Sequence, residues 1–331
     1  TVLGTQEHLK NPSITNVKNY HDQYYVPNNM AICLSGDFDP EEMIALVDQY
    51  FGDMQPNPEI PVLEYEPEQP ITEPIVKEVV GLDAANVAIG WRLGGATSAD
   101  ADLANIVGSI LYNGQAGLID LNLNQQQKTL SAYGYPSISA DYGYMQLAGR
   151  PKQGQSLEEV RDLLLGEVAK LRAGEFDEKL IAAAVNNYKL EMMQYLDSND
   201  GRADAYVQSF INGVEWKDEV AMFDRLSKIT KEDIVRFANE KLGEQNYAII
   251  YKRQGKDPNE QKIAKPEITP IITNRDAQSD FFKAVAASEV KPIEPRFVDF
   301  EKDMDRFEAQ SGIEVLYKQN STTDYFSLEY M

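Results

Sequence analysis

The chain has 331 residues, which suits two domains of about 150 residues each. Its hydrophobic fraction of 43% and aromatic fraction of 10% are typical of a folded protein with a substantial core. The formal net charge of −22 comes from acids spread along the chain, which excludes the clustered basic face that nucleic acids and anionic membranes require. The negative charge is explained by its contribution to solubility, and the alternative explanation is that it attracts basic peptides. No apolar run approaches the roughly 18 residues of a membrane span, and no secretory leader begins at Thr1.

The first part of the chain is predicted to form a helix, a strand and a second helix. Ser13 and Thr15 can cap a helix that runs to about Tyr25. The apolar run Met30–Ser35 predicts a buried strand, and it contains the only cysteine, Cys33. A single cysteine cannot form an internal disulfide. A packed thiol is favoured over a nucleophile, because a reactive thiol needs an electropositive and partly open setting.

The second helix begins at a strong N-terminal signal. Asp39 is the expected N-cap, and Pro40 follows in the first turn, where its missing N–H costs nothing. Glu41 and Glu42 complement the positive end of the helix dipole. Together with Asp37 these acids could suggest a metal site, but the helix start accounts for them.

A complete α+β unit is predicted between two linkers. Residues 54–74 hold six prolines and little periodicity, which is typical of an exposed linker. Residues 75–253 form the unit, with helical spacing of apolar residues at 103–111 and a further helix expected at 115–127. Alternate apolar residues predict a strand with one buried face, at Val87, Ile89, Trp91 and Leu93.

A tyrosine cluster belongs to the strands predicted near residues 130–149. Tyr142 and Tyr144 are two residues apart, so their side chains are expected on the same face of the strand. With Tyr133 and Tyr135 they either line an inner sheet surface that touches peptide or reflect packing and strand propensity alone.

The second half of the unit is predicted to be mostly helical. Ser156 and Glu159 form a capping box at the start of a helix. A long helix is expected at 177–196, followed by a turn at 198–201. Asp and Asn residues at this turn faintly resemble a calcium loop, but no bidentate glutamate has the required spacing. Two more helices and a strand at 246–251 complete the unit.

The C-terminal part is predicted to be a second linker and the beginning of another domain. Residues 254–305 hold five widely spaced prolines and one short helix around 281–285. Residues 313–317 and 326–330 are predicted to pair as a hairpin. A lone two-stranded ribbon is marginal in water, so 306–331 are expected to be the first strands of a third domain.

An internal repeat indicates a partial domain at the front as well. Ile14 and Ile229 are 215 residues apart (229 − 14), and Asn29 and Asn246 are 217 apart (246 − 29). Ile14 and Asn29 bracket one predicted helix, and Ile229 and Asn246 bracket another, so residues 1–53 are expected to be the tail of a domain and the chain a fragment. Apolar surfaces left uncovered at both ends are expected to be covered by self-association or by packing on the central domain.

Four short stretches carry a family resemblance. They are Gly4–Leu9, Tyr24–Met30, Gly36–Asp39 and Tyr50–Gly52. In combination they resemble the pitrilysin-like (M16) zinc metallopeptidases, in which such a string ends the first domain. The resemblance implies that 75–253 are a complete second, inactive domain and that 254–305 connect to the family's second half. It also implies an antiparallel sheet with helices on one face, and two halves that close around a peptide like a clam shell.

The family's zinc motif is missing from this sequence. In His-x-x-Glu-His, two histidines one helical turn apart bind zinc and the glutamate activates the bound water. The two histidines here, His8 and His21, are 13 residues apart (21 − 8), and neither begins the motif. The family's substrate-holding arginine and tyrosine, about seven residues apart, also have no match. No catalytic residue, metal ligand or cofactor is therefore predicted in this chain, its substrate-binding residues stay unassigned, and zinc is expected elsewhere in the parent protein.

The resemblance implies a non-catalytic domain that forms one wall of the peptide chamber of a bacterial-type zinc metallopeptidase. The alternative is an inactive paralogue that serves as a scaffold or binding partner for an active M16 subunit. A zinc motif encoded before Thr1 would favour the first hypothesis and its absence the second. The expected partners are a peptide substrate, other M16 domains of the same chain or of a partner subunit, and a second copy of this chain. The bacterial periplasm or cell envelope is favoured over the cytoplasm.

Overall fold

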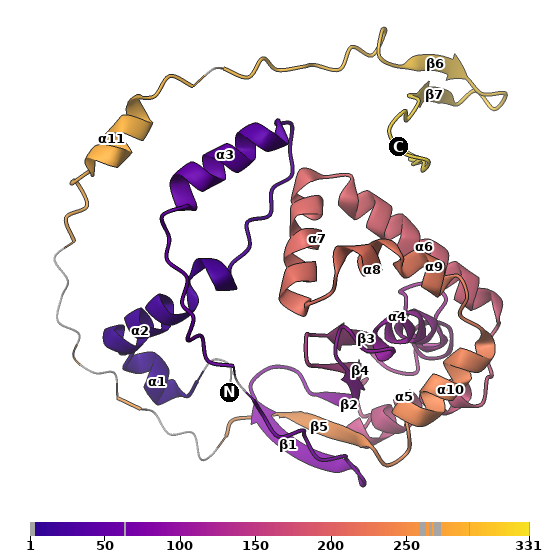
Figure 1. The fold of residues 1–331 in the computed structure, drawn as a ribbon. Helices are drawn as coiled ribbons and strands as arrows, with labels where there is room; N and C mark the ends of the chain where they lie inside the picture. The colour runs from indigo at the N-terminus through magenta and orange to yellow at the C-terminus, as the bar shows by residue number, and fades with distance from the viewer. Residues whose placement is uncertain are drawn as a thin grey trace. The chain divides into compact units, whose positions relative to one another are not determined.

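The computed structural model describes residues 4–62, 64–257, 263, 264, 267, 273–290 and 292–330. The chain divides into two compact units, one of Thr1–Pro12 with Ile263–Met331 and one of Ser13–Lys262. The larger unit contains a five-stranded sheet and most of the helices (Figure 1). Within the described ranges, no helix is both long and apolar enough for a membrane crossing.

The larger unit begins with the two helices that the sequence predicts. Helix α2 spans Ile14–Tyr24, and the Ser13 hydroxyl caps it by accepting from the amide of Asn16 at 3.2 Å. After the short 3-10 helix η1 (Pro27–Asn29), helix α3 spans Pro40–Phe51. The Asp39 carboxylate accepts from two amides of its first turn, at 2.9 and 3.1 Å. Asp39 therefore caps this helix as predicted, and Glu41 and Glu42 lie in its first turn.

The predicted strand at Met30–Ser35 is not formed. These residues belong to no β-ladder, and Ile32 and Leu34 are 46% and 45% exposed. The prediction was wrong because an apolar run becomes a buried strand only when a neighbouring strand pairs with it. Cys33 is accordingly only partly buried.

Five strands form the sheet of the larger unit, in the order β1-β5-β2-β4-β3. Their bounds are β1 Ile75–Gly81, β2 Asn86–Gly94, β3 Ser131–Ile138, β4 Tyr142–Arg150 and β5 Tyr247–Gln254. The α+β fold class is confirmed, and three of the four strand pairs are antiparallel. The sheet is therefore mainly antiparallel, as the resemblance implies, and differs from that expectation only at β1, which pairs with β5 in parallel, with Ile75 opposite Ala248. Strand direction depends on how a distant segment enters the sheet, and alternation within one strand does not encode it.

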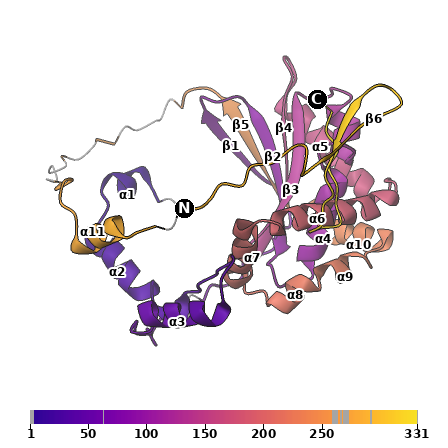
Figure 2. The ribbon, with the colours of Figure 1, turned by 90° about the horizontal axis from the view of Figure 1, so that it is seen from above.

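One face of the sheet carries the core. The predicted alternation in β2 is confirmed, since Val87, Ile89 and Trp91 are fully buried. Three helices pack on this face: α4 Asp100–Leu111, α5 Leu157–Arg172 and α10 Lys231–Lys241 (Figure 2). The indole N–H of Trp91 donates to the carbonyl of Gly243 at 3.0 Å, so this large ring leaves no polar atom unsatisfied.

Further helices extend the layer on the covered side of the sheet. They are the π-helix η2 Asp120–Asn124, α6 Lys179–Leu196, α7 Asn199–Asn212, α8 Trp216–Val220 and α9 Met222–Leu226. The predicted helix at 115–127 is thus much shorter than expected. The predicted turn at 198–201 is instead the start of α7, where the Ser198 hydroxyl accepts from the amide of Gly201 at 2.9 Å. Four helices, not two, lie between this cap and β5.

The smaller unit contains α1 (Gln6–Lys10), α11 (Asp280–Ala287) and the hairpin of β6 (Asp305–Glu308) and β7 (Glu314–Tyr317). The short helix expected around 281–285 is confirmed by α11. The predicted hairpin partner was wrong, since β7 pairs with β6 and residues 326–330 form no strand. Gly312, with φ of +81°, lies in the tight connection between β6 and β7. This short connection lets β7 pair with β6, the segment that precedes it in the chain. Part of the predicted 254–305 linker lies outside the described residues.

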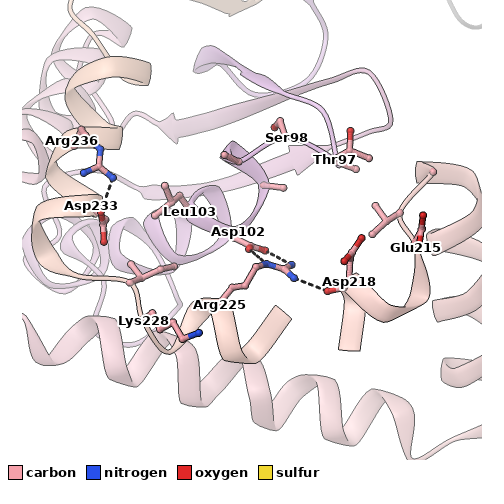
Figure 3. A pocket seen from close by; sticks show the side chains of 16 residues that line it. Thr97, Ser98, Asp102, Leu103, Glu215, Asp218, Arg225, Lys228, Asp233 and Arg236 are labelled. Carbon is pink, nitrogen blue, oxygen red and sulfur yellow. Dashed lines mark hydrogen bonds and ion pairs between the residues drawn. The ribbon is translucent and has the colours of Figure 1, made fainter. Parts of the chain in front are cut away.

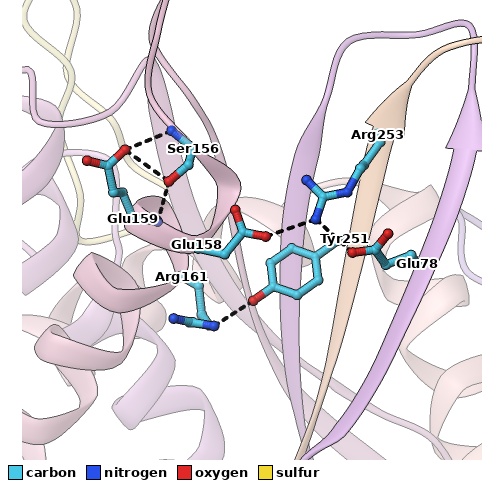
Figure 4. Close-up of polar contacts among 7 residues, drawn as sticks. All are labelled: Glu78, Ser156, Glu158, Glu159, Arg161, Tyr251 and Arg253. Atoms are coloured by element: carbon cyan, nitrogen blue, oxygen red, sulfur yellow. Dashed lines mark hydrogen bonds and ion pairs between the residues drawn. The ribbon is translucent and has the colours of Figure 1, made fainter.

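A charged cluster holds the exposed edge strand β1 to the rest of the sheet (Figure 4). The guanidinium of Arg253 on β5 lies 2.7 Å from Glu78 of β1 and 2.9 Å from Glu158 of α5. These hydrogen bonds lower the pKa of both carboxyl groups and raise the pKa of Arg253. Arg161 of α5 adds a link to β5 by donating to the Tyr251 hydroxyl at 2.8 Å. Edge strand, neighbouring strand and helix are thereby joined at one point.

Replacing Arg253 tests this cluster through its pH dependence. The pKa values of Glu78 and Glu158 are lowered from 4.5 in the folded chain, so their stabilising contribution is present above that pH and is lost as the pH falls through the lowered values. We expect Arg253→Gln to lower the melting temperature slightly at pH 7, since exposed ion pairs contribute little. The difference from the unmodified protein should shrink below pH 4.5 in thermal melts. A difference that stays constant down to acidic pH would contradict this role.

Two glycines in helices provide a matched test of the packing. A Cβ added at Gly108 of α4 would lie 2.6 Å from the Pro136 ring of β3, whereas a Cβ at Gly166 of α5 would meet nothing within 4 Å. Alanine favours helix over glycine by about 1 kcal/mol, so Gly166→Ala should stabilise by up to that amount. For Gly108→Ala we expect the ring contact to outweigh this gain, with a net loss of about 1–3 kcal/mol. Chemical denaturation measures both, and stabilisation at both positions would refute the close approach of α4 to β3.

Candidate functional site

The face of the sheet opposite the core helices carries a group of half-exposed side chains, which we call the open sheet face. Its members are Arg92 of β2, Tyr133 and Tyr135 of β3, Tyr142, Tyr144 and Gln146 of β4, and Ile250 of β5. The four tyrosines are 39–45% exposed, whereas the alternating residues Met145 and Leu147 of β4 are fully buried. The predicted placement of the tyrosine cluster on one sheet surface is therefore confirmed.

The tyrosines of β3 form an ordered aromatic surface. The rings of Tyr133 and Tyr135 stack with centroids 6.3 Å apart and planes within 6° of parallel. Tyr112, just after α4, tilts against Tyr133 at 6.5 Å. The side-chain amide of Gln146 donates to the Tyr135 hydroxyl at 3.1 Å. Such rings offer apolar area together with hydroxyl groups, which suits contact with side chains and backbone of a peptide.

An extended part of the chain itself lies on this face. The backbone amide of Glu68 donates to the Tyr142 hydroxyl at 3.3 Å. Arg92 donates to the carbonyl of Gln69 at 3.1 Å and lies 3.6 Å from the Glu68 carboxylate. The central carbon of the Arg92 guanidinium is also 5.8 Å from the Tyr142 ring centroid. The open sheet face thus holds an extended backbone through both an N–H and a carbonyl group, contacts that do not depend on sequence.

Arg92 and Gln146 were not singled out by the sequence. Both alternate with buried residues in strands that the pattern does predict, which is the signal that could have placed them on this face. Their partners could not be inferred, because Arg92 and Gln69 are 23 residues apart and Glu68 and Tyr142 are 74 apart.

The two histidines have local structural contacts. His8 completes a capping box at α1, where the amide of Thr5 donates to its Nδ1 atom at 3.5 Å. His21 stacks on Tyr25 with centroids 4.8 Å apart and lies 3.3 Å from Asp22. Among the residues with described positions, no three His, Cys, Asp or Glu side chains gather as a metal-binding group. The assignment of no catalytic residue and no metal ligand stays a prediction.

A polar cavity of about 670 Å³ lies between the loop before α4 and helices α8, α9 and α10 (Figure 3). Arg225 binds Asp102 through two nitrogens, at 2.6 and 3.3 Å, and donates to the carbonyl of Asp218 at 2.8 Å. The hydrogen bond that Arg225 donates to Asp102 raises the pKa of Arg225. Arg236 and Asp233 pair across 2.6 Å in the same wall. These charged groups are paired with one another. Arg225 joins α9 to α4 and α8, and this role explains the polar lining of the cavity better than peptide binding does.

Comparison with characterised sequences finds relatives among zinc proteases. The chain is 24% identical over 258 residues to the mitochondrial-processing peptidase subunit beta of Saccharomyces cerevisiae, covering 73% of this chain and 55% of that protein. It is 22% identical over 249 residues to the zinc protease PqqE of Helicobacter pylori, covering 72% of this chain and 55% of PqqE. The chain therefore spans about half the length of these relatives.

Solved structures share the fold. A protease from Helicobacter pylori superposes with a TM-score of 0.71 at 17% identity, over 76% of this chain and 61% of that one. The peptidase M16 inactive domain from Pseudomonas fluorescens gives 0.62 at 14% identity, over 73% and 57% of the two chains. The periplasmic protease PqqL of Escherichia coli gives 0.59 at 12% identity, over 97% of this chain and 38% of PqqL.

The family assignment comes from the sequence match. Residues 13–188, just over half of the chain, match the sequence model of the peptidase M16 inactive domain. This range includes α2 and α3, β1 to β4 and the tyrosines of the open sheet face. The chain belongs to the peptidase M16 inactive-domain family.

Proposed function

We propose that this chain is a non-catalytic part of a zinc metallopeptidase and that the open sheet face forms one wall of its peptide chamber. The observation that carries the proposal is the extended segment at Glu68 and Gln69, held on this face by contacts to its backbone amide and carbonyl. A substrate peptide presents the same groups in the same extended form. The relative named as a zinc protease supports peptide hydrolysis by the parent protein, with zinc bound outside this chain.

The contribution of this wall to the reaction is positioning. Holding a peptide by its backbone limits its motion and brings the scissile bond to a fixed place, which lowers the entropic part of the barrier. The tyrosines add apolar area on which side chains of different shape can lie. Bond cleavage itself would take place on residues of another domain.

A second candidate function is that of a scaffold or binding subunit beside an active M16 subunit. It is favoured by the relative that is named as a subunit, the beta subunit of mitochondrial-processing peptidase. The encoded protein distinguishes the two functions, because His-x-x-Glu-His ahead of Thr1 supports the first and its absence supports the second. Other M16 domains, or a second copy of this chain, are the proposed partners. A bacterial periplasm is the proposed location, in line with the periplasmic structural relative.

Peptide binding tests the proposed wall. We expect the double variant Tyr135→Ser, Tyr144→Ser to bind an unstructured fluorescent peptide about thirtyfold more weakly, from two aromatic contacts of about 1 kcal/mol each. Both side chains point away from the core, so the melting temperature should change little. The control variant Phe210→Ser removes an exposed ring from α7, and its affinity should match that of the unmodified chain. If the unmodified chain, the double variant and Phe210→Ser bind the peptide with equal affinity in fluorescence anisotropy, the open sheet face is not a peptide-binding wall.

Metal content tests the assignment of the chemistry to another domain. After dialysis against zinc and then against buffer, the purified chain should retain clearly less than one zinc per molecule by elemental analysis. His8→Ala should leave that value unchanged, because the His8 ring is engaged in capping α1. One tightly held zinc per chain, together with hydrolysis of a peptide, would contradict both candidate functions.

A further inference from the structure

A second cavity lies in the helical layer, away from the open sheet face. It has a volume of about 430 Å³ and is formed by residues of α6, α7, α8 and α9 with the ends of these helices. Four aromatic side chains line it: Tyr188, Tyr195, Trp216 and Phe223. Its size falls within the range of about 300–1,000 Å³ typical of small-molecule sites.

The aromatic side chains form a partly open cage. Tyr188 and Phe223 lie at an angle to one another with ring centroids 5.9 Å apart. Trp216 is 40% exposed and is held edge-on by Tyr206 at 4.6 Å, while Met222 is only 7% exposed. These exposures place Trp216 at the mouth of the cavity and Met222 at its floor. A ligand could therefore enter past the indole and contact ring faces inside.

One acid lies among these apolar side chains. Glu219 of α8 lines the cavity and is partly buried, and none of the described residues hydrogen-bonds or pairs with its carboxylate. Loss of solvent raises the pKa of Glu219, against the opposing effect of Arg225. That arginine is already engaged by Asp102 through two nitrogens. A carboxylate kept from water without a partner carries a free-energy cost that a bound cation would remove.

We propose that this cavity binds an organic cation with an apolar body. The positive group lies beside Glu219, and the hydrocarbon part lies against Tyr188, Trp216 and Phe223. Aromatic faces attract cations, most strongly where water is excluded, and the thioethers of the two lining methionines adapt to ligands of different shape. The acid and the rings together favour a cation over a neutral or anionic molecule of the same size. This site is independent of peptide binding on the open sheet face.

Calorimetry with a matched pair of probes tests the proposal. The probes are 2-phenylethylammonium and its neutral counterpart 2-phenylethanol, titrated into the full chain at pH 7.5. We expect the ammonium probe to bind at least about tenfold more tightly than the alcohol, as ion pairing and cation–π attraction add up. Quenching of Trp216 fluorescence by the bound probe locates it, because the other tryptophan, Trp91, is fully buried in the sheet core.

Two variants separate the site from a general effect of charge. Glu219→Gln keeps the shape of the side chain and removes its charge, so the preference for the ammonium probe should fall to the smaller part that the rings contribute, while the melting temperature stays the same or rises. Glu215→Gln removes one charge just before α8 from a residue that does not line this cavity, and should leave the preference intact. Equal binding of the two probes, no binding at millimolar concentration, or an unchanged preference in Glu219→Gln would each overturn the proposal.

Discussion

The structure depends on a sheet that is covered on one face and open on the other. In β2, Val87, Ile89 and Trp91 are removed completely from water by the helices on the covered side. The residues between them point the opposite way, because successive side chains of a strand alternate. Burial of one set therefore fixes the register of the sheet, and a slip by one residue would expose the whole core. The same constraint orders the tyrosines of β3 and β4 on the partly exposed face of the sheet.

The edges and helices of this unit are joined by interactions distant in sequence. Arg253 connects two acids from β1 and α5, and Arg225 connects α9 to Asp102 of α4. Each guanidinium can donate in several directions at once, which suits the joining of three segments. The unit thus presents two sites of different chemistry: an aromatic sheet face suited to extended backbone, and a partly open cavity whose acid, Glu219, has no partner among the described residues.

Local chemistry was enough to predict much of the fold. Helix starts with a capping residue followed by acids, such as Ser156 with Glu159, appear where expected because capping involves only neighbouring residues. The alternation of β2 was equally reliable. The strand predicted at Met30–Ser35 and the partner chosen for β7 failed, because strand formation needs a neighbour that the local pattern does not specify. The parallel direction of β1 was missed for the same reason.

The candidate site could be predicted only in part. The tyrosines follow from alternation, but the extended segment beside them joins residues 74 positions apart, Glu68 and Tyr142. The absence of the zinc motif is a property of the sequence alone. For this reason the chemistry is proposed to lie outside this chain, with binding and positioning as the tasks proposed for it.

Photo-crosslinking can determine whether a peptide lies on the open sheet face. A benzophenone amino acid at Tyr144, and in a separate protein at Phe210 of α7, would be irradiated with a labelled unstructured peptide. We expect a crosslinked product from position 144 that excess unlabelled peptide suppresses, and little product from position 210. Equal yields at both positions, or product from position 210 alone, would contradict this expectation.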